Sequence, residues 1–485
     1  MARNSDSQQG AGSAKSIRER INTSRRTILK SVGAAAGAAT IGGTTVTAAT
    51  QQSDQNNIIM YVGDGQGTSH ISIGRYLKAY QEDPEAFPQN TRSAEYNFDR
   101  HDNVGLTTVH PHDPDEVITD SAAAATTFSA GVKSYNGGVG GVEDNGEFRE
   151  ITTILEAVRE QGYATGLVTT ARMTHATPAA FASHVPDRDQ EDEIARQYVD
   201  DQNVDVLFGG GRQHFLPESR DDGRDITQDF QDQGYNYVTT ESELDSVNEE
   251  PTLGLFAQDS HMSYALDRMG DESEEPGLPK MAERAIDILE AESGDNGFFL
   301  MIEAARIDHA SHANDFAVAH EQTEADDAVG VILDRAAETA NDTLVISTAD
   351  HECGGLSLGT EGPYDVNYDV LDKVTASGEA MNEAISGVEE EFGDEGADEI
   401  ADLIEEFGGF EPTETEIDAA LGYGVGMKEV INERARIGWT TAGHTGEEVP
   451  TFASGPNAEQ VNSMHDHIDL ANIMFETAGI DNPNR

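Results

Sequence analysis

The sequence predicts an α/β fold built on one large, mostly parallel sheet with helices on both faces. Short apolar runs alternate with helical patterns along most of the chain, which is the order that βαβ units produce. The chain has 485 residues, of which 37% are hydrophobic, so it can bury a large core. It has one cysteine, so no intrachain disulfide can stabilise the fold.

The strands and helices are expected in a regular order. Apolar runs predict buried strands near residues 58–62, 164–169, 204–208, 298–302, 343–347 and 449–453. Helical periodicity predicts helices near 121–132, 151–161, 278–292 and 315–338. Residues 354–437 break the alternation with glycine-rich turns, an acidic helical stretch around Glu389–Glu406 and no clear core strand. We interpret 354–437 as an insertion in a single domain that covers 51–485.

The acidic balance of the chain limits its partners. There are 91 Asp and Glu residues against 30 Lys and Arg residues, and the formal net charge is -61. Such a chain repels nucleic acid and anionic membranes. Acidic residues recur between apolar runs from Asp54 to Asp481, which favours an acidic shell on a folded protein over an acidic disordered tail. We interpret the shell as an adaptation to multimolar salt, where the Debye length falls to roughly 3 Å; an acidic protein from ordinary surroundings is the alternative.

The first 50 residues resemble a twin-arginine export signal. Arg25 and Arg26 precede an apolar run of small residues at 31–39, and cleavage is expected near Ala48 or Ala49. A flexible basic arm is the alternative. No later uncharged apolar stretch is long enough to span a membrane. The sequence therefore predicts an exported protein, secreted or held in a cell-surface or periplasm-like space.

Asp64 is the first candidate for a ligand-binding residue. In sheets of this kind ligands bind at the carboxyl ends of the strands, and Asp64 directly follows the first predicted strand. The glycines on both sides of it allow the backbone to approach a ligand closely. A simple Gly-Asp-Gly turn is the alternative.

Ser121 is the candidate nucleophile. It opens an alanine-rich helical segment, and the free N–H groups of a helix N-terminus attract anions. An ordinary N-cap serine is the alternative. No Gly-x-Ser-x-Gly motif surrounds Ser121, so activation by a metal is favoured over a catalytic triad.

The segment after the strand at 164–169 contributes Thr177 and Arg188. Thr177 offers a hydroxyl group, and the planar guanidinium of Arg188 can hold two oxygens of an anion. A structural role is the alternative for each. Because basic residues are scarce in this chain, Arg188 in a strand-end loop is a stronger indication of a site than an arginine usually is.

Two further strand ends carry the strongest signal. A buried strand leads to Glu303, and Asp308 and His312 follow it four residues apart, the spacing that places side chains on one face of a helical turn. Asp350 and His351 follow the strand near 343–347. Aspartate and histidine together suit zinc. Two strand ends of this kind therefore predict a metal centre.

His444 is the remaining candidate, in a run of small residues before the last predicted strand. For a single histidine a structural role is the simpler interpretation. The chain has 15 histidines. Those interpreted as surface or structural residues are His101, His110, His112, His261, His465 and His467.

In chain order, these motifs resemble those of the alkaline phosphatase family over nearly the whole chain after residue 50. The matching motifs are Asp-Ser-Ala-Ala at 120–123, Ala-Thr-Pro-Ala-Ala at 176–180, Glu-x4-Asp-x3-His at 303–312, Ala-Asp-His at 349–351 and Gly-His-Thr-Gly at 443–446. The resemblance implies an alkaline phosphatase-like fold and hydrolysis of phosphate monoesters through a phosphoserine at Ser121, with two zinc ions and one magnesium ion.

The resemblance also implies the residues of the site. The implied sets are Asp308, His312 and His444 for one zinc, Asp64, Asp350, His351 and the Ser121 oxygen for the second zinc, and Asp64, Thr177 and Glu303 for magnesium. Arg188 matches the phosphate-binding arginine of the family.

Three positions near these sets stand out. The best-known bacterial pattern has aspartate at position 175 and lysine at position 309, whereas this chain has His175 and His309. The magnesium site is therefore open to two interpretations: His175 favours another metal, or it acts only through water. His309 is expected to contact phosphate by way of water. Cys353, close to His351, is interpreted as a small packed residue, because the implied ligand sets are complete without it.

Related activities are the alternatives. An arylsulfatase would carry a Cys/Ser-x-Pro-x-Arg motif, which this chain lacks. A phosphodiesterase would lack the pairing of Ser121 and Arg188 with this full ligand set. A metal-stabilised surface binding protein would bind zinc without hydrolysis. The expected partners are small phosphate monoesters, and a homodimer is compatible with the resemblance because family members are commonly homodimers.

Overall fold

The computed structural model describes residues 56–247, 249–270, 273–294, 296–339, 342–360, 362–392, 396–420 and 426–485. All of them belong to one structural unit, Ser53–Arg485. The export signal expected at 1–50 lies outside the described residues. In the part of the chain that is described, no helix is both long and apolar enough to cross a membrane.

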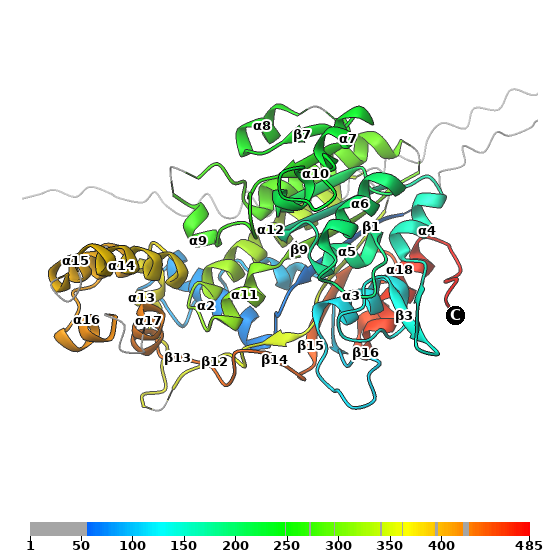
Figure 1. Cartoon of the computed structure of the whole chain (residues 1–485). Helices are drawn as coiled ribbons and strands as arrows, with labels where there is room; N and C mark the ends of the chain where they lie inside the picture. The colour runs from blue at the N-terminus through cyan, green and yellow to red at the C-terminus, as the bar shows by residue number, and fades with distance from the viewer. Residues whose placement is uncertain are drawn as a thin grey trace, which may run out of the picture. The chain divides into compact units, whose positions relative to one another are not determined.

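A ten-stranded sheet forms the centre of this unit (Figure 1). Its order is β16 (Ser463–Asp466), β2 (Asn103–Thr108), β15 (Val449–Ser454), β10 (Thr343–Ala349), β1 (Asn57–Gly63), β9 (Phe298–Ala304), β5 (Ala164–Arg172), β6 (Val206–Gly210), β8 (Thr252–Leu255) and β7 (Asn236–Val238). Within the sheet only β15 runs antiparallel to its neighbours, β10 and β2. The predicted mostly parallel sheet is confirmed, and each of the six predicted strands is present.

Strand β1 shows why the sheet is covered on both sides. All seven of its residues are buried, as expected for a strand of a parallel sheet between two helical layers. Ile59 and Tyr61 pack into one apolar cluster, and Ile58, Met60 and Val62 pack into a second. Because successive side chains of a strand point to opposite faces, the two clusters lie on opposite faces of the sheet.

Different helices cover the two faces (Figure 1). Helices α2 (Thr68–Glu82), α10 (Leu278–Ser293) and α12 (Val318–Glu338) contribute to the cluster of Tyr61. Helices α3 (Ser121–Ala130), α4 (Ile154–Glu160), α5 (Ala176–Ala182) and α18 (His467–Thr477) contribute to the cluster of Met60. The helices predicted near 121–132, 151–161, 278–292 and 315–338 are therefore confirmed, with shorter ends for three of them.

Shorter elements connect these layers. They are β3 (Gly141–Asp144), β4 (Glu147–Glu150), α6 (Glu191–Asp201), α7 (Ile226–Asp232), α8 (Glu241–Ser246), α9 (Ala265–Arg268), α11 (Arg306–His312) and β14 (His444–Thr445). Helix α11 and strand β14 carry residues of the candidate site.

The described residues of 354–437 are mainly helical, with α13 (Tyr368–Lys373), α14 (Gly378–Phe392), α15 (Ala397–Gly408), α16 (Glu414–Ala420) and α17 (Met427–Ala435). Two short strand pairs close this segment at its base. In the inner pair Leu358 of β12 (Ser357–Leu358) lies opposite Ile437 of β13 (Ile437–Gly438), and in the outer pair Cys353 of β11 (Glu352–Cys353) lies opposite His444. Among the described residues of the segment, none joins the large sheet, as predicted. Its status as an insertion stays an interpretation.

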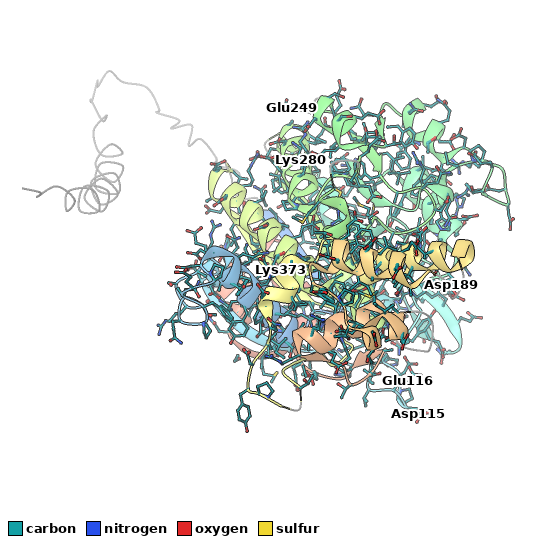
Figure 2. The ribbon with its side chains drawn as sticks, turned by 90° about the vertical axis from the view of Figure 1, so that its left-hand side faces the viewer. Asp115, Glu116, Asp189, Glu249, Lys280 and Lys373 are labelled. Atoms are coloured by element: carbon teal, nitrogen blue, oxygen red, sulfur yellow. The ribbon has the colours of Figure 1, made fainter. Side chains whose placement is uncertain are left out.

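Carboxylate groups occupy widely separated positions on the surface. Asp189 and Glu249 are exposed and lie at different places on the outside of the ribbon, apart from each other and from the exposed neighbours Asp115 and Glu116 (Figure 2). This distribution agrees with an acidic shell on a folded protein.

Candidate active site

Three central strands bring buried carboxylates together at their carboxyl ends. The pairing register places Gly63 of β1 opposite both Ala304 of β9 and Ala349 of β10. Asp64 and Asp350 directly follow the ends of β1 and β10, and Glu303 lies opposite Val62. The side chains of Asp64, Glu303 and Asp350 are all completely buried. Parallel pairing therefore brings together three acidic groups that are distant in the sequence.

These carboxylates have more oxygen atoms than there are hydrogen-bond donors around them. Both carboxylate oxygens of Asp64, Oε1 of Glu303 and Oδ2 of Asp350 are buried without a hydrogen-bond partner, and so is Oγ1 of Thr177. Burial raises the pKa of Asp64 well above its usual value, with a further increase from Asp350 and other acidic neighbours. Burial also raises the pKa of Glu303 to about 7. Native interiors rarely leave such groups unpartnered, so this set fits bound cations.

His351 links the carboxylates to Ser121. Its Nε2 atom lies 3.1 Å from Oδ2 of Asp350, 3.7 Å from Oδ1 of Asp64 and 3.4 Å from Oγ of Ser121. Burial lowers the pKa of His351, but the charge of Asp350 more than offsets this and leaves that pKa above its usual value. In Asp350 burial raises the pKa, and His351 reverses the shift. Ser121 therefore faces a polar, charged cluster.

Helix α3 begins at this cluster, and Asp120 is its N-cap. An Asp120 carboxylate oxygen accepts a hydrogen bond of 2.9 Å from the backbone N–H of Ala123. Ser121 is the first helical residue and is only 2% exposed. The alternative that Ser121 itself caps the helix is wrong, because Asp120 already fills that position. The Ser121 hydroxyl is therefore free for another role.

Asp308, His312 and His444 form a second group of potential ligands. Asp308 and His312 lie four residues apart on α11, as the spacing predicts, with His312 Nε2 3.3 Å from Asp308 Oδ2. His444 Nε2 lies 3.7 Å from Asp308 Oδ1, which has no hydrogen-bond partner. The side chain of His312 is 39% exposed, so the site opens to solvent here.

Backbone carbonyl groups determine the tautomers of His312 and His444. Nδ1 of His312 donates to the carbonyl oxygen of Ala442 (2.8 Å), and Nδ1 of His444 donates to that of Thr119 (2.9 Å). Burial, reinforced by His351, lowers the pKa of His444 to about 4, so its ring is neutral at neutral pH. Nε2 of His444 then carries a lone pair, and it lies only 3.0 Å from Nε2 of His312. Two imidazole nitrogens at this separation can bind one metal ion.

A third group contains Asp64, Glu303 and His175, whose potential ligand atoms all lie within 4.8 Å of one another. His175 is the N-cap residue of α5, and Thr177 follows in the first turn. Arg188 Nη2 donates to His175 Nε2 at 2.9 Å. The structure thus places His175, Thr177 and Arg188 beside the carboxylates, as expected.

His309 is accompanied by a histidine that we expected to be a surface or structural residue. The ring of His261 packs 3.8 Å, centre to centre, from that of His309, and His175 lies 5.8 Å from both. Arg172 Nη1 donates to Nε2 of His261 at 2.8 Å. His261 lies in the turn between β8 and α9, where no motif signals a function. His101 and His467 are buried and hydrogen-bonded, in line with structural roles.

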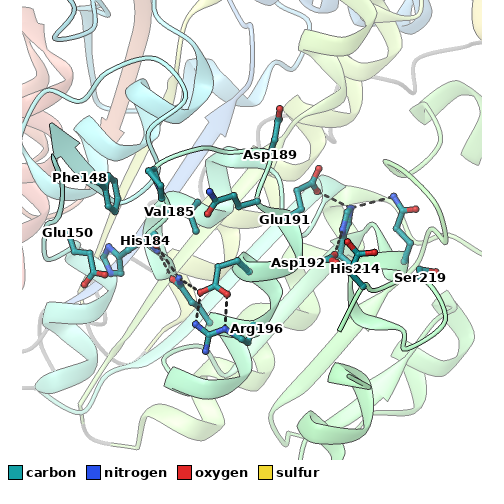
Figure 3. Close-up of a pocket in the computed structure, with 16 residues that line it drawn as sticks. Phe148, Glu150, His184, Val185, Asp189, Glu191, Asp192, Arg196, His214 and Ser219 are labelled. Carbon is teal, nitrogen blue, oxygen red and sulfur yellow. Dashed lines mark hydrogen bonds and ion pairs between the residues drawn. The ribbon is translucent and has the colours of Figure 1, made fainter. Parts of the chain in front are cut away.

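A separate surface pocket of about 880 Å³ is lined in part by Val185 and Asp189, which belong to the loop that carries Arg188 (Figure 3). Its wall includes His184, Glu191, Asp192 and His214 but none of the potential metal ligands. His214 contacts Asp192 through Nδ1 (2.9 Å) and Glu191 through Nε2 (3.2 Å). These groups satisfy one another, so the pocket is not the candidate site.

Comparisons with known proteins agree with this geometry. A family model described as alkaline phosphatase matches residues 55–480. Alkaline phosphatase 4 of Bacillus subtilis is 36% identical over 434 residues, which cover 87% of this chain and 88% of that protein.

Two solved structures are also similar. The cold-active alkaline phosphatase of Shewanella sp. has a TM-score of 0.74 and 31% identity and covers 87% of this chain and 99% of its own. A histidine-to-aspartate variant of the alkaline phosphatase from TAB5, solved with Mg bound in its M3 site, has a TM-score of 0.63 and 25% identity, with 88% and 99% covered. This chain therefore belongs to the alkaline phosphatase family and is a phosphomonoester hydrolase.

Proposed function

We propose that the protein hydrolyses phosphate monoesters to an alcohol and inorganic phosphate through a phosphoserine at Ser121, with two zinc ions and one magnesium ion. The observation that carries the proposal is the position of Ser121. Its hydroxyl lies at the N-terminus of α3, 3.4 Å from His351 Nε2 and beside buried carboxylates that lack donors. A helix N-terminus attracts phosphate to that hydroxyl.

The residues fit the three cations by their donor chemistry. One zinc would be held by Asp308, His312 and His444, a second by Asp64, Asp350, His351 and the Ser121 oxygen, and magnesium by Asp64, Thr177 and Glu303. When bound, the zinc ions lower the pKa values of the hydroxyl and of water and neutralise charge on the phosphoryl oxygens.

The covalent steps take place on Ser121. The hydroxyl gives up its proton, Oγ forms a bond to phosphorus, and the ester P–O bond breaks as the alcohol leaves and takes up a proton. Water then attacks phosphorus, the Oγ–P bond breaks, and Ser121 regains a proton. Arg188 and the N–H groups at the start of α3 hold the phosphoryl oxygens in both steps.

His175 supports magnesium over a softer metal in the third position. Arg188 has only donors, so His175 Nε2 must accept from it, and the ring proton then resides on Nδ1. That Nδ1 is buried without a partner. A protonated Nδ1 donates to water or to an oxygen and does not bind a metal. We therefore propose that His175 contacts the metal of the third site through water, and that the oxygen ligands bind magnesium directly. In the TAB5 enzyme, Mg is bound in the M3 site of a variant in which a histidine is replaced by aspartate.

Hydrolysis of a chromogenic phosphate monoester, in parallel with its sulfate and diester analogues, tests the proposal. We expect the monoester to be the best substrate in multimolar salt at alkaline pH, with activity lost on chelation and in Ser121→Ala. Acid-stable labelling of the wild-type protein by labelled phosphate should also disappear in that variant. Activity that survives Ser121→Ala would exclude the phosphoserine, and preference for the diester would indicate a phosphodiesterase.

Location and assembly form a second part of the proposal. The paired arginines and apolar run within 1–50 support export by the twin-arginine route, and family membership supports a homodimer. Replacing Arg25 and Arg26 by lysine should retain the uncleaved protein inside the cell. Light scattering of the exported protein should give twice the chain mass. Export of the double variant would contradict the twin-arginine route, and a monomeric mass would contradict the homodimer.

A further inference from the structure

We propose that Cys353 is a fourth protein ligand of the metal held by Asp308, His312 and His444. This inference rests on the proposed metal-dependent function and adds a sulfur atom to one of its metal sites. A ligand atom from each of these four residues lies within 4.8 Å of those of the other three. The sequence alone favoured a merely packed thiol, and only the fold brings Cys353 to this position.

Backbone pairing fixes Cys353 beside the site. In the short antiparallel pair of β11 and β14, Cys353 lies directly opposite His444. Directly opposed side chains lie on the same face, with Cβ atoms about 4.5–5.5 Å apart. The N–H of Cys353 donates to the carbonyl oxygen of Gly65 (3.1 Å), and that of Gly354 donates to Gly443 (3.0 Å). The thiol is therefore held on the same side as the His444 imidazole.

The surroundings of the thiol point to a cation as well. Cys353 is completely buried. Asp308 is only 5% exposed, and its Oδ1 atom has no hydrogen-bond partner. The Nε2 atoms of His312 and His444 lie 3.0 Å apart in the same group. One carboxylate oxygen, two imidazole nitrogens and one sulfur form a four-ligand set that suits zinc. On binding, the thiol releases its proton to solvent and the sulfur forms the metal bond.

A thiolate ligand has a functional consequence. Catalytic zinc keeps a position for water or substrate and can expand to five ligands, so a substrate oxygen would join four protein ligands here. Sulfur also favours softer metals than carboxylate does. The metal site that contains Asp308 and Cys353 should therefore prefer zinc or cadmium. The all-oxygen site that contains Glu303 should show no such preference.

Cobalt substitution of the metal-free, full-length protein tests this directly. We expect Co²⁺ to produce visible d–d bands together with a near-ultraviolet thiolate-to-cobalt charge-transfer band. Because the chain has one cysteine, any such band must come from Cys353. Cys353→Ser should lose the band and keep visible absorption, and its zinc affinity should fall by at least the roughly 10–100-fold that loss of an outer-shell partner costs.

His312→Ala is the matched control, because it removes a neighbouring ligand and retains the thiol. Because Asp308, His444 and the thiol remain, this variant should keep the charge-transfer band but need more cobalt to reach it, whereas Cys353→Ser should lack the band at any cobalt concentration. Visible d–d bands without a charge-transfer band in the wild type would refute the cysteine ligand and leave the metal site intact. That result does not depend on the folding of any variant. Absence of all cobalt bands would refute both the ligand and the proposed metal-dependent function.

Discussion

Arg188 donates a hydrogen bond of 3.0 Å from Nη1 to Oδ2 of Asp120, so the residue that caps helix α3 also orients the proposed phosphate-binding arginine. The same Asp120 oxygen accepts from the N–H of Gly137 at 3.0 Å. One carboxylate therefore couples the start of the helix that carries Ser121 to the side chain expected to bind substrate.

Asp120→Ala should reduce both stability and phosphate binding. Loss of the cap should lower the free energy of unfolding by about 1 kcal/mol. Release of Arg188 should weaken inhibition by inorganic phosphate by on the order of tenfold, the scale of coupling within one hydrogen-bond network. Denaturant unfolding and phosphate inhibition measure the two effects. Asp120→Asn is the control: it keeps an oxygen for Ala123 but loses the acceptor for Arg188 and Gly137, so it should lose less stability than Asp120→Ala while phosphate binding still weakens. Unchanged phosphate binding in both variants would show that Asp120 does not orient Arg188 for phosphate binding.

Gly65→Ala should displace a metal ligand. Gly65 has φ +71°, and a Cβ atom there would lie 2.9 Å from both Cα and Oδ1 of Asp308. A residue with a Cβ atom at this positive φ should lower the free energy of unfolding by roughly 1–2 kcal/mol. The clash with Asp308 should in addition lower the affinity for zinc. Gly223→Ala is the matched control, because Gly223 has φ +65° and nothing within 4 Å of its Cβ position. Zinc titration of both variants checks this. Equal zinc affinities would exclude the steric effect on Asp308.

Chelation should make stability sensitive to pH. Without cations, burial raises the pKa of Glu303 from 4.5 to about 7, so the folded state favours the protonated carboxyl. The resulting contribution to stability is complete below about pH 4.5 and is lost as the pH rises through about 7. Thermal unfolding in the presence of chelator should therefore show a falling Tm over this range, and metal-loaded protein should not. Glu303→Gln should flatten the chelated profile; a profile as steep as wild type would assign the effect to another group.

His184 should contribute stability that weakens at alkaline pH. Its Nδ1 lies 2.6 Å from the Gly140 carbonyl oxygen and its Nε2 lies 2.8 Å from Glu156, so the imidazolium can donate to both. Burial lowers its pKa, but Glu156 reverses the shift and raises the pKa from 6.5 to about 8. The contribution, about 2 kcal/mol, is complete below about pH 6.5 and lost through about pH 8. Urea unfolding of wild type and His184→Gln should differ most near pH 6. A difference that does not change with pH would indicate an uncharged role.

Salt should stabilise the protein far beyond ordinary ionic strength. With a formal net charge of -61, repulsion among surface carboxylates opposes the folded state. Raising NaCl to about 1 M shortens the Debye length to roughly 3 Å and should raise the free energy of unfolding. Denaturation by urea, which is uncharged, measures this without adding salt. Sucrose at equal osmolality is the control. A stability that does not respond to NaCl would contradict the halophilic interpretation.

Sequence patterns predicted the central strands well, because residues buried on both faces form continuous apolar runs, as in β1 and β9. The short edge strand β7 has only three residues, too few for a recognisable pattern. The antiparallel direction of β15 depends on a tertiary connection that local periodicity does not encode.

The candidate site was predictable where local spacing determines geometry. Asp308 and His312 share a helical face because they are four residues apart. Contacts made across the fold were not predictable: the role of Asp120 as cap and arginine partner, the close packing of the His261 and His309 rings, and the pairing of Cys353 with His444. Each depends on how separate segments meet, which composition and periodicity do not specify.

The paired strands at the base of residues 354–437 have a consequence for the length of this segment. Leu358 lies opposite Ile437 and Cys353 lies opposite His444, so the chain between them leaves and returns through one closed stem. Loops closed at a fixed stem tolerate changes of length at small entropic cost. The length of the chain beyond the stem can therefore change at small entropic cost while the pairing of β11 with β14 keeps His444 in its place.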